Sequence, residues 1–331
     1  MSIPSGTLRI GFIGAGGIVR TRHLPNLKLI PGLEFVAVCN QRRATAEVIA
    51  RDFGIAEVMD DWKALIARPD LHAIWIGTPP YMHAELTLAA LAAGKHVFCQ
   101  ARMAMNLPQA REMLAAAQSR PNQVTMLCPP PHGMRGDPTV RRLLKDNVLG
   151  KLLHFRLQAF NDAWANPTTP AHWRQKIELS GQNILSVGIY AEVLGKWLGH
   201  PLELHATRHV FHPDRQGYHV QIPDWVTVTG RWPNDLFGTL EWSGVAQAAH
   251  HEQLELYGDA GTLVYDFTED RLYVALNGQK SLHERPIRAE EQGQWTVEQD
   301  FIHAIRTGTQ PEPSFATGVK YMEFLDSIWA T

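Results

Sequence analysis

The sequence feature that most constrains the fold is a glycine-rich turn close to the start of the chain. An apolar run of strand length over residues 8–13 is followed directly by Gly14, Gly16 and Gly17, and an amphipathic stretch then extends over residues 18–30. Strand, glycine turn and helix in this order form the opening of a dinucleotide-binding βαβ unit. In such a unit Gly14 permits the tight turn, and Gly16 lacks the Cβ that would block a pyrophosphate.

A glycine turn alone is also compatible with a tight strand–helix connection that binds no ligand. The third glycine of the usual fingerprint is replaced here by Val19. The complete βαβ context favours a nucleotide site, because the free N–H groups at the start of the helix face the phosphates. The residues of this turn that we expect to bind the cofactor are Gly14, Gly16, Gly17 and Ile18.

The hydrophobic pattern after this turn predicts an α/β fold with alternating strands and helices up to Cys128. The expected strands cover residues 33–39, 57–59, 73–77, 95–99 and 123–128, and the expected helices cover 44–53, 61–67, 82–93 and 108–119. The run at 73–77 is nearly continuous in apolar residues, as is typical of a buried parallel strand. The pattern predicts a doubly wound parallel sheet of the Rossmann type in a first domain over residues 1–128.

From residue 129 onward the pattern is that of an α+β domain with a large, mostly antiparallel open sheet. The expected strands cover 151–160, 202–211, 225–232, 236–242, 251–257, 262–266 and 271–276, and the expected helices cover 138–147, about 184–198, 295–306 and 317–329. We expect this second domain, over 129–331, to bind the substrate. Because one face of so large a sheet would otherwise stay uncovered, we also expect it to form a homodimer or homotetramer.

The composition argues against several classes of partner. Lys and Arg total 31 against 33 Asp and Glu, a formal net charge of −2, so we expect no nucleic-acid surface. The N-terminus lacks signal-peptide character, and charges interrupt the apolar runs before they could span a membrane. Three cysteines in a long chain favour a reducing compartment, so a cytoplasmic protein with buried thiols is expected. No histidine pair near the expected site has metal-ligand spacing, and we predict no metal.

The residues after the second strand indicate which cofactor is used. An acidic residue at this point would hold the ribose 2′-OH of NAD and repel a 2′-phosphate. The sequence instead has Asn40, Gln41, Arg42 and Arg43, a neutral stretch followed by two cations suited to a phosphate. A solvated, basic helix start would have the same composition. We predict NADP in preference to NAD, with Asn40, Arg42 and Arg43 as cofactor-binding residues.

Two further motifs accompany the glycine turn. They are Thr78-Pro79-Pro80-Tyr81-Met82-His83 and Ala93-Gly94-Lys95-His96-Val97-Phe98-Cys99. Together the three resemble the Gfo/Idh/MocA family of sugar-type oxidoreductases, closely over the N-terminal domain and loosely over the C-terminal one. The resemblance implies that the chain binds NAD(P) and oxidises or reduces a hydroxyl or carbonyl group of a sugar, polyol or related small metabolite. It also implies cofactor contacts at the strand ends, at Thr78, Pro79, His83 and Gln100.

The chain departs from this family where the chemistry takes place. After the fifth strand the family usually has Glu-Lys-Pro, whose lysine touches the reacting oxygen, and these positions are Gln100, Ala101 and Arg102 here. An alanine cannot transfer a proton. Arg102 brings a permanent charge that suits binding an anion or polarising a carbonyl, but its high pKa makes it a poor acid or base.

A second family signature places Asp, His and Asp on one helix face, and the matching positions here are Ser186, Tyr190 and Val193. Spacings of four and three residues keep these positions on one side of a helix. We predict Tyr190 and Arg102 as the catalytic residues. A core tyrosine whose hydroxyl is satisfied would give the same pattern.

The expected substrate-binding residues lie in the same domain. The irregular stretch 161–175 contains Trp173 and Arg174, which suit a sugar or a carboxylated ring, although a packed loop with one long arginine would look alike. Asn183 and Ser186 keep a polar helix face beside Tyr190.

Three functions are compatible with these residues. The first is an NADP(H)-dependent oxidoreductase of a sugar-like or carboxylated carbonyl compound, in which Tyr190 supplies the proton and Arg102 the charge. A neutral tyrosine can donate a proton as it stands, so this reading favours reduction. The second is an enzyme that retains NAD(P) and uses transient oxidation to eliminate or hydrolyse a substrate. The third is a sensor-like protein that binds the dinucleotide without turnover.

Overall fold

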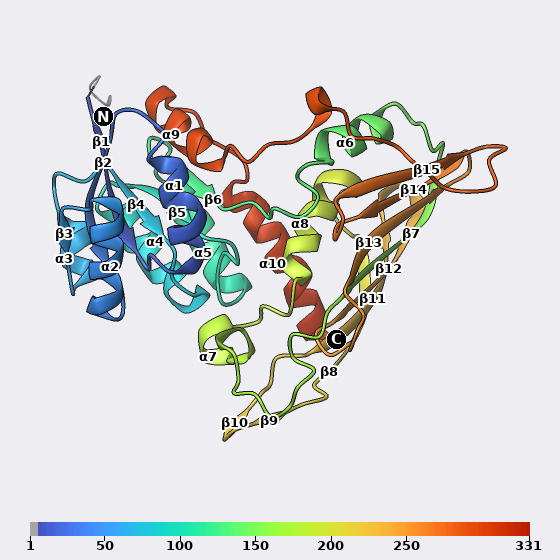
Figure 1. The fold of residues 1–331 in the computed structure, drawn as a ribbon, viewed down its shortest axis with the longest axis horizontal. Coiled ribbons are helices and arrows are strands. Elements are labelled where there is room, and N and C mark those ends of the chain that lie inside the picture. Colours follow the sequence, from blue (N-terminus) through green and yellow to red (C-terminus); the bar gives the residue numbers. More distant parts are fainter. Residues whose placement is uncertain (1–5) are drawn as a thin grey trace. The chain divides into compact units, whose positions relative to one another are not determined.

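The computed structural model describes residues 6–331, which form two compact units (Figure 1). The first unit comprises the chain up to Pro129 together with Thr296–Val319, and the second comprises Pro130–Trp295 with Lys320–Thr331. The expected boundary after residue 128 lies next to the observed one. The structure differs at Thr296–Val319, which belongs to the first unit although it follows the whole second sheet in the sequence.

The first unit contains a parallel six-stranded sheet with the strand order β3-β2-β1-β4-β5-β6. Its strands are β1 (Leu8–Ile13), β2 (Leu33–Cys39), β3 (Glu57–Val58), β4 (Ala73–Ile76), β5 (His96–Cys99) and β6 (Thr125–Leu127). This order confirms the predicted Rossmann sheet. The central strand β4 is buried along its whole length, as its continuous apolar run predicts.

The helices of the first unit are α1 (Leu24–Leu27), α2 (Arg43–Phe53), α3 (Trp62–Ala67), α4 (His83–Ala92), α5 (Leu107–Gln118) and α9 (Val297–Thr307). Local signals set several of their ends. The Asp61 side chain accepts a hydrogen bond from the Lys63 N–H at the start of α3, and Gly54 ends α2 with a φ of 69°.

The helix after the glycine turn differs from the single helix expected over residues 18–30. The structure has a π-helical turn, η1 (Val19–His23), which the N–H of Leu24 closes on the carbonyl of Val19, and the short α1 follows. Pro25 explains the interruption, because its nitrogen cannot donate the hydrogen bond that would continue an α-helical ladder. The π turn directs His23 into the interior, where its side chain is fully buried.

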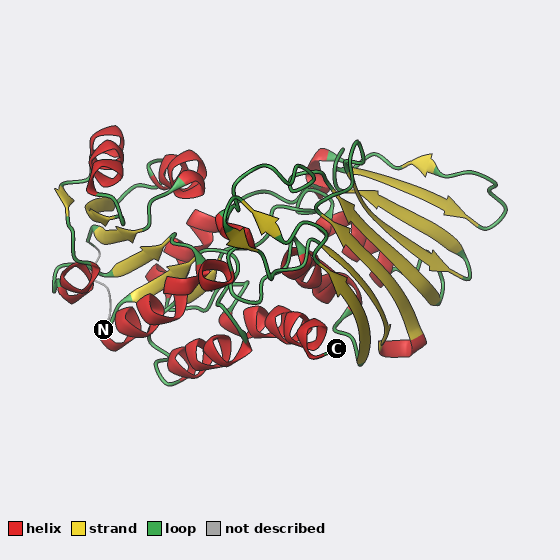
Figure 2. Ribbon diagram, turned by 90° about the horizontal axis from the view of Figure 1, so that it is seen from below, coloured by secondary structure: helices red, strands yellow, loops and turns green. Residues whose placement is uncertain are grey.

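The second unit is built on an eight-stranded sheet with the order β16-β15-β14-β13-β7-β12-β11-β8, seen in Figure 2 as a broad curved array. Its strands are β7 (Leu152–Phe160), β8 (Glu203–His209), β11 (Trp225–Trp232), β12 (Leu236–Ser243), β13 (His251–Gly258), β14 (Gly261–Asp266), β15 (Arg271–Leu276) and β16 (His283–Glu284). All pairs are antiparallel except β7 with β12, which confirms the expected sheet type.

The other elements of this part of the chain are α6 (Asp137–Lys145), α7 (Ile177–Ser180), α8 (Val187–Leu198), α10 (Phe315–Ala330) and the small pair β9 (Asp214–Arg215) and β10 (Tyr218–His219). Two-residue strands such as β9, β10 and β16 are too short to leave a periodic signal, and none was expected from the sequence. The division between the two units falls within α10.

Three further features belong to the described residues 6–331. The three cysteines are free and buried, as expected. These residues contain no helix long and apolar enough to cross a membrane. Among the same residues no three His, Cys, Asp or Glu side chains are grouped so that they could hold a metal ion.

Candidate active site

The glycine turn has one glycine that the fold requires and two that leave space open. Gly14 has a φ of +79°, and a Cβ there would lie 2.5 Å from the backbone nitrogen of Thr78. A Cβ on Gly16 would meet only the Gly14 carbonyl, at 3.9 Å, and one on Gly17 would have nothing within 4 Å. The free volume lies where a dinucleotide pyrophosphate is expected, so the turn fits the predicted cofactor.

Two side chains near this turn frame the same space. The Thr78 hydroxyl is buried and has no hydrogen-bond partner in the described part of the chain, as expected of a group that meets a ligand. Ile18, at the start of η1, is 38% exposed. Pro79 and Pro80 fix the turn that follows Thr78.

Asn40 holds the glycine turn in place. Its Oδ1 accepts a hydrogen bond from the backbone N–H of Ala15 at 2.8 Å, and its Nδ2 donates to the Thr45 hydroxyl at 3.1 Å. The amide is therefore engaged within the protein, and it brings no negative charge to the end of β2.

The two arginines after β2 are in different states. Arg43 is engaged by two carboxylates, with Nε 2.9 Å from Glu47 and NH1 2.5 Å from Asp60. Arg42 is exposed at the start of α2, and its guanidinium makes no hydrogen bond or ion pair within the residues that the structure describes. Arg42 is thus the cation of the pair that is available to a phosphate.

His83 links the turns that follow β4 and β5. Its ring is fully buried, with Nε2 2.7 Å from the Thr78 carbonyl and Nδ1 2.9 Å from the Arg102 carbonyl. Burial lowers the pKa of His83, which favours the neutral ring. The imidazole contacts the carbonyl groups of both turns, and the cofactor contact at His83 stays a prediction.

The end of β5 carries the residues that replace the family's lysine motif. Arg102 has a φ of 64°, a left-handed conformation that is uncommon for a residue with a Cβ. The side-chain oxygen of Gln100 lies 3.0 Å from Nε2 of His23, a residue that no sequence motif marks as functional.

In the second unit Tyr190 lies in an aromatic cluster. Its ring makes edge contacts with Phe267 at 5.0 Å and with His132 at 5.6 Å, and its buried hydroxyl has no hydrogen-bond partner of ordinary geometry in the described residues. Burial and the nearby carboxylate of Glu252 raise the pKa of Tyr190 well above its usual value. The phenol therefore stays protonated at neutral pH. His132 lies 3.7 Å from Glu252, and burial lowers the pKa of His132.

The helix that carries Tyr190 begins directly after Ser186. Ser186 occupies the N-cap of α8, and its carbonyl accepts from the N–H of Tyr190 at 3.1 Å, one turn along. Asn183 is buried, and its Nδ2 donates to the Ser180 carbonyl at 2.6 Å. Asn183 thus stabilises the turn before α8.

The irregular stretch 161–175 is a packed loop that ends in a single helical turn. Its anchor is Arg215, which is 1% exposed and donates to the backbone carbonyls of Trp164 and Asn166. Arg174 is exposed, with its guanidinium 4.4 Å from the centre of the Trp173 ring. The loop presents the Arg174 guanidinium beside the Trp173 ring.

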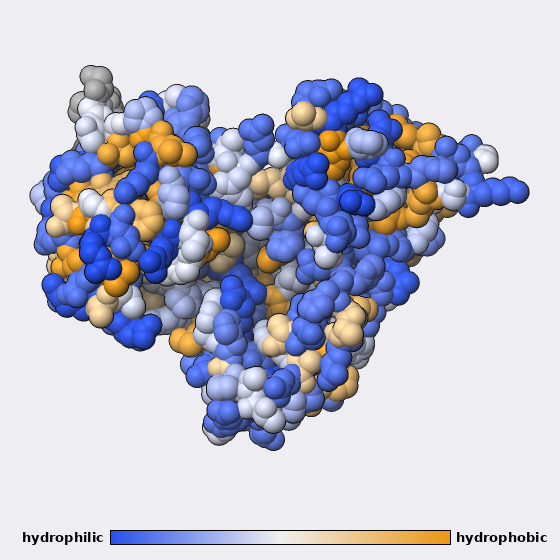
Figure 3. Space-filling view, in the orientation of Figure 1, coloured by the Kyte–Doolittle hydropathy of each residue, from blue (hydrophilic) through white to orange (hydrophobic). Residues whose placement is uncertain are grey.

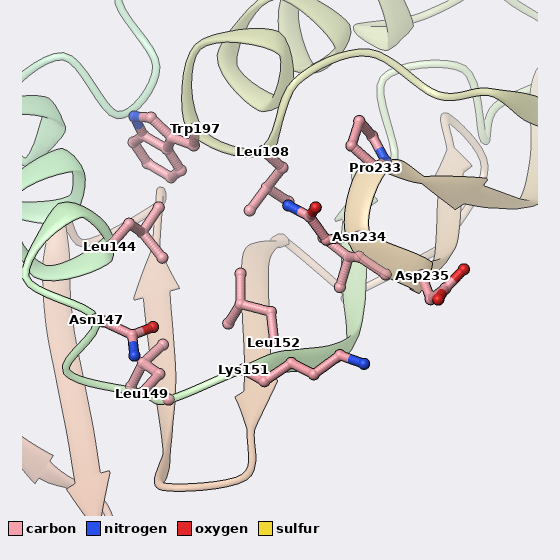
Figure 4. A pocket seen from close by; sticks show the side chains of 12 residues that line it. Leu144, Asn147, Leu149, Lys151, Leu152, Trp197, Leu198, Pro233, Asn234 and Asp235 are labelled. Atoms are coloured by element: carbon pink, nitrogen blue, oxygen red, sulfur yellow. The ribbon is translucent and has the colours of Figure 1, made fainter.

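A cavity of about 580 Å³ lies elsewhere in the second unit (Figure 4). Its wall combines leucines of α6 and β7 with Trp197 and with the turn at Asn234 and Asp235. None of the residues expected to bind cofactor or substrate lines it, and we assign it no function.

Comparison with known proteins settles the family. Residues 8–127 match the model of the oxidoreductase family with an NAD-binding Rossmann fold, and residues 138–264 match the Gfo/Idh/MocA C-terminal domain. The chain belongs to the Gfo/Idh/MocA family. This confirms the resemblance seen in the sequence and the expectation of an NAD(P)-dependent oxidoreductase acting on hydroxyl and carbonyl groups.

Two curated members of the family match nearly the whole chain. Levoglucosan dehydrogenase from Pseudarthrobacter phenanthrenivorans is 26% identical over 97% of this chain and 95% of its own length. The dTDP-3,4-didehydro-2,6-dideoxy-alpha-D-glucose 3-reductase from Streptomyces antibioticus is 28% identical over 92% and 91%.

Two solved structures have the same fold over nearly the whole chain. Levoglucosan dehydrogenase in complex with NADH superposes with a TM-score of 0.85 at 25% identity, covering 98% of this chain and 96% of that one. A 3-ketoreductase from Actinomadura kijaniata in complex with NADP shares the fold, with a TM-score of 0.78 at 21% identity and 98% of both chains covered. These relatives are complexed with different cofactors, one with NADH and the other with NADP.

Proposed function

We propose that this protein is an NADP(H)-dependent reductase of a sugar-like or carboxylated carbonyl compound. The observation that supports it most is the state of Tyr190. Its phenol is buried and, like that of any tyrosine, protonated at neutral pH, and it lies on α8, where the sequence resemblance matches it to the family's histidine. A protonated phenol is an acid, which suits reduction of a carbonyl and not abstraction of a proton from an alcohol.

We assign the following roles in binding and reaction to residues of this chain. When bound, NADPH supplies the hydride. The glycine turn holds the pyrophosphate, and Arg42 holds the 2′-phosphate. Tyr190 donates the proton to the carbonyl oxygen, while Arg102 supplies a fixed positive charge for the substrate. Trp173, Arg174 and Ser186 are the proposed substrate contacts, with Asn183 supporting the turn before α8.

The names of the relatives support a sugar-like substrate, since both curated relatives act on sugars or sugar nucleotides by name. A panel of keto sugars and keto acids with NADPH tests the proposal by absorbance at the nicotinamide band. Oxidation of NADPH with any of them supports a reductase. Tight NADPH binding without turnover across the panel would favour a sensor-like protein, and cofactor that stays bound through purification while a substrate is cleaved would favour a lyase or hydrolase.

Cofactor choice gives the first prediction. Arg42→Ala is expected to weaken NADPH binding by about tenfold to a hundredfold, because a charge-assisted phosphate contact contributes about 1.5–3 kcal/mol. NADH binding should change little. Arg43→Ala is the matched control with a smaller effect, since Glu47 and Asp60 already engage that guanidinium. Fluorescence titration with both cofactors measures the difference, and equal affinity of the wild type for NADPH and NADH would contradict the assignment.

We also propose that the outer face of the second sheet mediates self-association. Phe237 is 54% exposed and is paired with His154, whose ring stacks on Tyr257 at 4.5 Å. These three residues are cross-strand neighbours on the adjacent strands β12, β7 and β13. Over β14 and β15, hydrophobic side chains are likewise interspersed with hydrophilic ones (Figure 3).

Replacing Phe237 by glutamate is therefore expected to weaken the oligomer at least about tenfold, as loss of a central aromatic contact does in other interfaces. Sedimentation velocity across a concentration series measures this. A wild-type protein that sediments as a monomer at all concentrations would exclude the proposed interface.

A further inference from the structure

His23 and Glu298 form a buried pair that neither the cofactor turn nor the sheet requires. Both side chains are 0% exposed, and Nδ1 of His23 lies 2.5 Å from Oε1 of Glu298. The two residues are 275 positions apart, and Glu298 reaches this place on α9. The second carboxylate oxygen accepts from Nδ2 of Asn26 at 3.1 Å, so both oxygens of Glu298 are engaged.

The ring of His23 is held by its surroundings as well as by Glu298. It packs on Trp75 at 5.0 Å and on Phe98 at 5.3 Å, and the thiol of Cys128 lies 3.9 Å from Nε2. The π turn η1 brings the residue to this point directly after the glycine turn. The imidazole of His23 is therefore the point at which the segment after the glycine turn, β5 and α9 come together.

The other ring nitrogen of His23 contacts Gln100. Since a carboxylate only accepts hydrogen bonds, Nδ1 of His23 must donate to Glu298, which fixes the plane of the ring and aims Nε2 at the amide of Gln100, 3.0 Å away. The side-chain amide of Gln100 has one oxygen and one nitrogen, and whichever of them faces His23, the other is available to a ligand. In the described residues no second partner for the Gln100 side chain is found.

The position of Gln100 in the sheet indicates which half of the cofactor it would contact. It directly follows β5, at the carboxyl edge of the sheet where ligands of doubly wound folds bind. Arg42 follows β2 in the half of the sheet that begins with the glycine turn, whereas β5 belongs to the other mononucleotide half. The two halves hold the two nucleotides of a dinucleotide, so Gln100 faces the nicotinamide nucleotide.

We propose that His23 and Glu298 are positioning residues, which hold the Gln100 amide toward the nicotinamide half of the cofactor. A buried histidine–carboxylate pair is by itself weak support for stability, because desolvation offsets the attraction between the two groups. A role in orienting Gln100 accounts for keeping such a pair at this end of β5. This inference rests on the proposed binding of NADPH and deepens it.

The test compares NADPH with 2′,5′-ADP, which contains only the adenosine half of the cofactor. The variants are His23→Phe, which keeps the ring packing, and Glu298→Gln, which keeps the shape. His96→Phe is the matched control, because His96 lies at the opposite end of β5, where its Nδ1 accepts from the Val124 N–H. Binding is measured by isothermal titration calorimetry on the full chain.

The expected result is selective. His23→Phe and Glu298→Gln should weaken NADPH binding about tenfold, the loss of one well-placed hydrogen bond, and leave 2′,5′-ADP binding unchanged. His96→Phe should leave both unchanged. A parallel loss of both ligands would show that the pair is only structural and would overturn the inference, as would unchanged NADPH affinity in both variants.

A further variant keeps the inference testable if the substitutions at the buried residues His23 and Glu298 prevent folding. Gln100→Leu changes a half-buried residue beyond the strand end and should show the same loss for NADPH alone. Unchanged NADPH binding in this variant would also overturn the inference. If the wild type binds neither NADPH nor 2′,5′-ADP, the proposed NADPH function fails and this inference fails with it. If the wild type binds NADPH and the variants bind it equally well, only this inference fails.

Discussion

Replacing Gly16 by valine is expected to abolish NADPH binding without unfolding the protein. A Cβ at this position meets only the Gly14 carbonyl at 3.9 Å, so the ligand-free chain can accommodate it. The larger side chain would occupy the space above the turn, where the pyrophosphate must approach the backbone N–H groups. Calorimetric titration should show no heat of NADPH binding, while the thermal unfolding midpoint stays close to that of the wild type.

Gly14→Ala serves as the contrasting variant. A Cβ at Gly14 would lie 2.5 Å from the Thr78 nitrogen on a residue with positive φ, so this substitution should destabilise the first unit itself. Loss of stability in Gly14→Ala but not in Gly16→Val separates the residue that shapes the turn from the one that admits the ligand. If Gly16→Val binds NADPH as the wild type does, the turn is only a connection and the proposed cofactor site is wrong.

Tyr190→Phe is expected to lower the turnover of carbonyl reduction by about a hundredfold or more and to leave NADPH affinity unchanged, because a positioned acid contributes about this much. The measurement is kcat on an identified substrate, together with a cofactor titration. Tyr265→Phe is the control. Its hydroxyl accepts from the Gly136 N–H at 3.0 Å, so its loss should affect stability and not turnover.

The pH dependence gives an independent check of this role. Because burial and Glu252 raise the pKa of Tyr190, the acid form persists at neutral pH and is lost only well above pH 10, the usual range of tyrosine. Glu252→Gln removes part of that effect, so the basic limb of the kcat profile should move to lower pH. Full wild-type turnover in Tyr190→Phe would mean that the tyrosine is structural and that the proton comes from another donor.

The sequence predicted the sheets well because their signals are local. β11 and β15 have the bounds that their apolar alternation predicts, and the parallel order of the first sheet follows from the glycine turn and the run at β4. The break in the helix after the glycine turn also has a local cause, Pro25, whose effect on a π turn is not readable from hydrophobic periodicity.

The candidate site was less predictable because its state depends on distant partners. Arg42 and Arg43 are alike in the sequence, and only the carboxylates of Glu47 and Asp60 set them apart. In the same way, burial raises the pKa of Tyr190 and Glu252, which comes from β13, raises it further. No local pattern marks such partners, since only the fold brings them to the side chain that they modify.

The inclusion of Thr296–Val319 in the first unit has a consequence for how this protein is made. The ribosome releases residues up to Pro129 long before α9 is synthesised. Until then, His23 of the nascent Rossmann unit lacks the carboxylate of Glu298, and Trp75 and Phe98 lack their contact with Phe301. Domains usually fold in the order in which they are synthesised. Here the first unit cannot be completed until the whole sheet of the second unit has been synthesised, and a nascent chain stalled before α9 should carry an unfinished cofactor site.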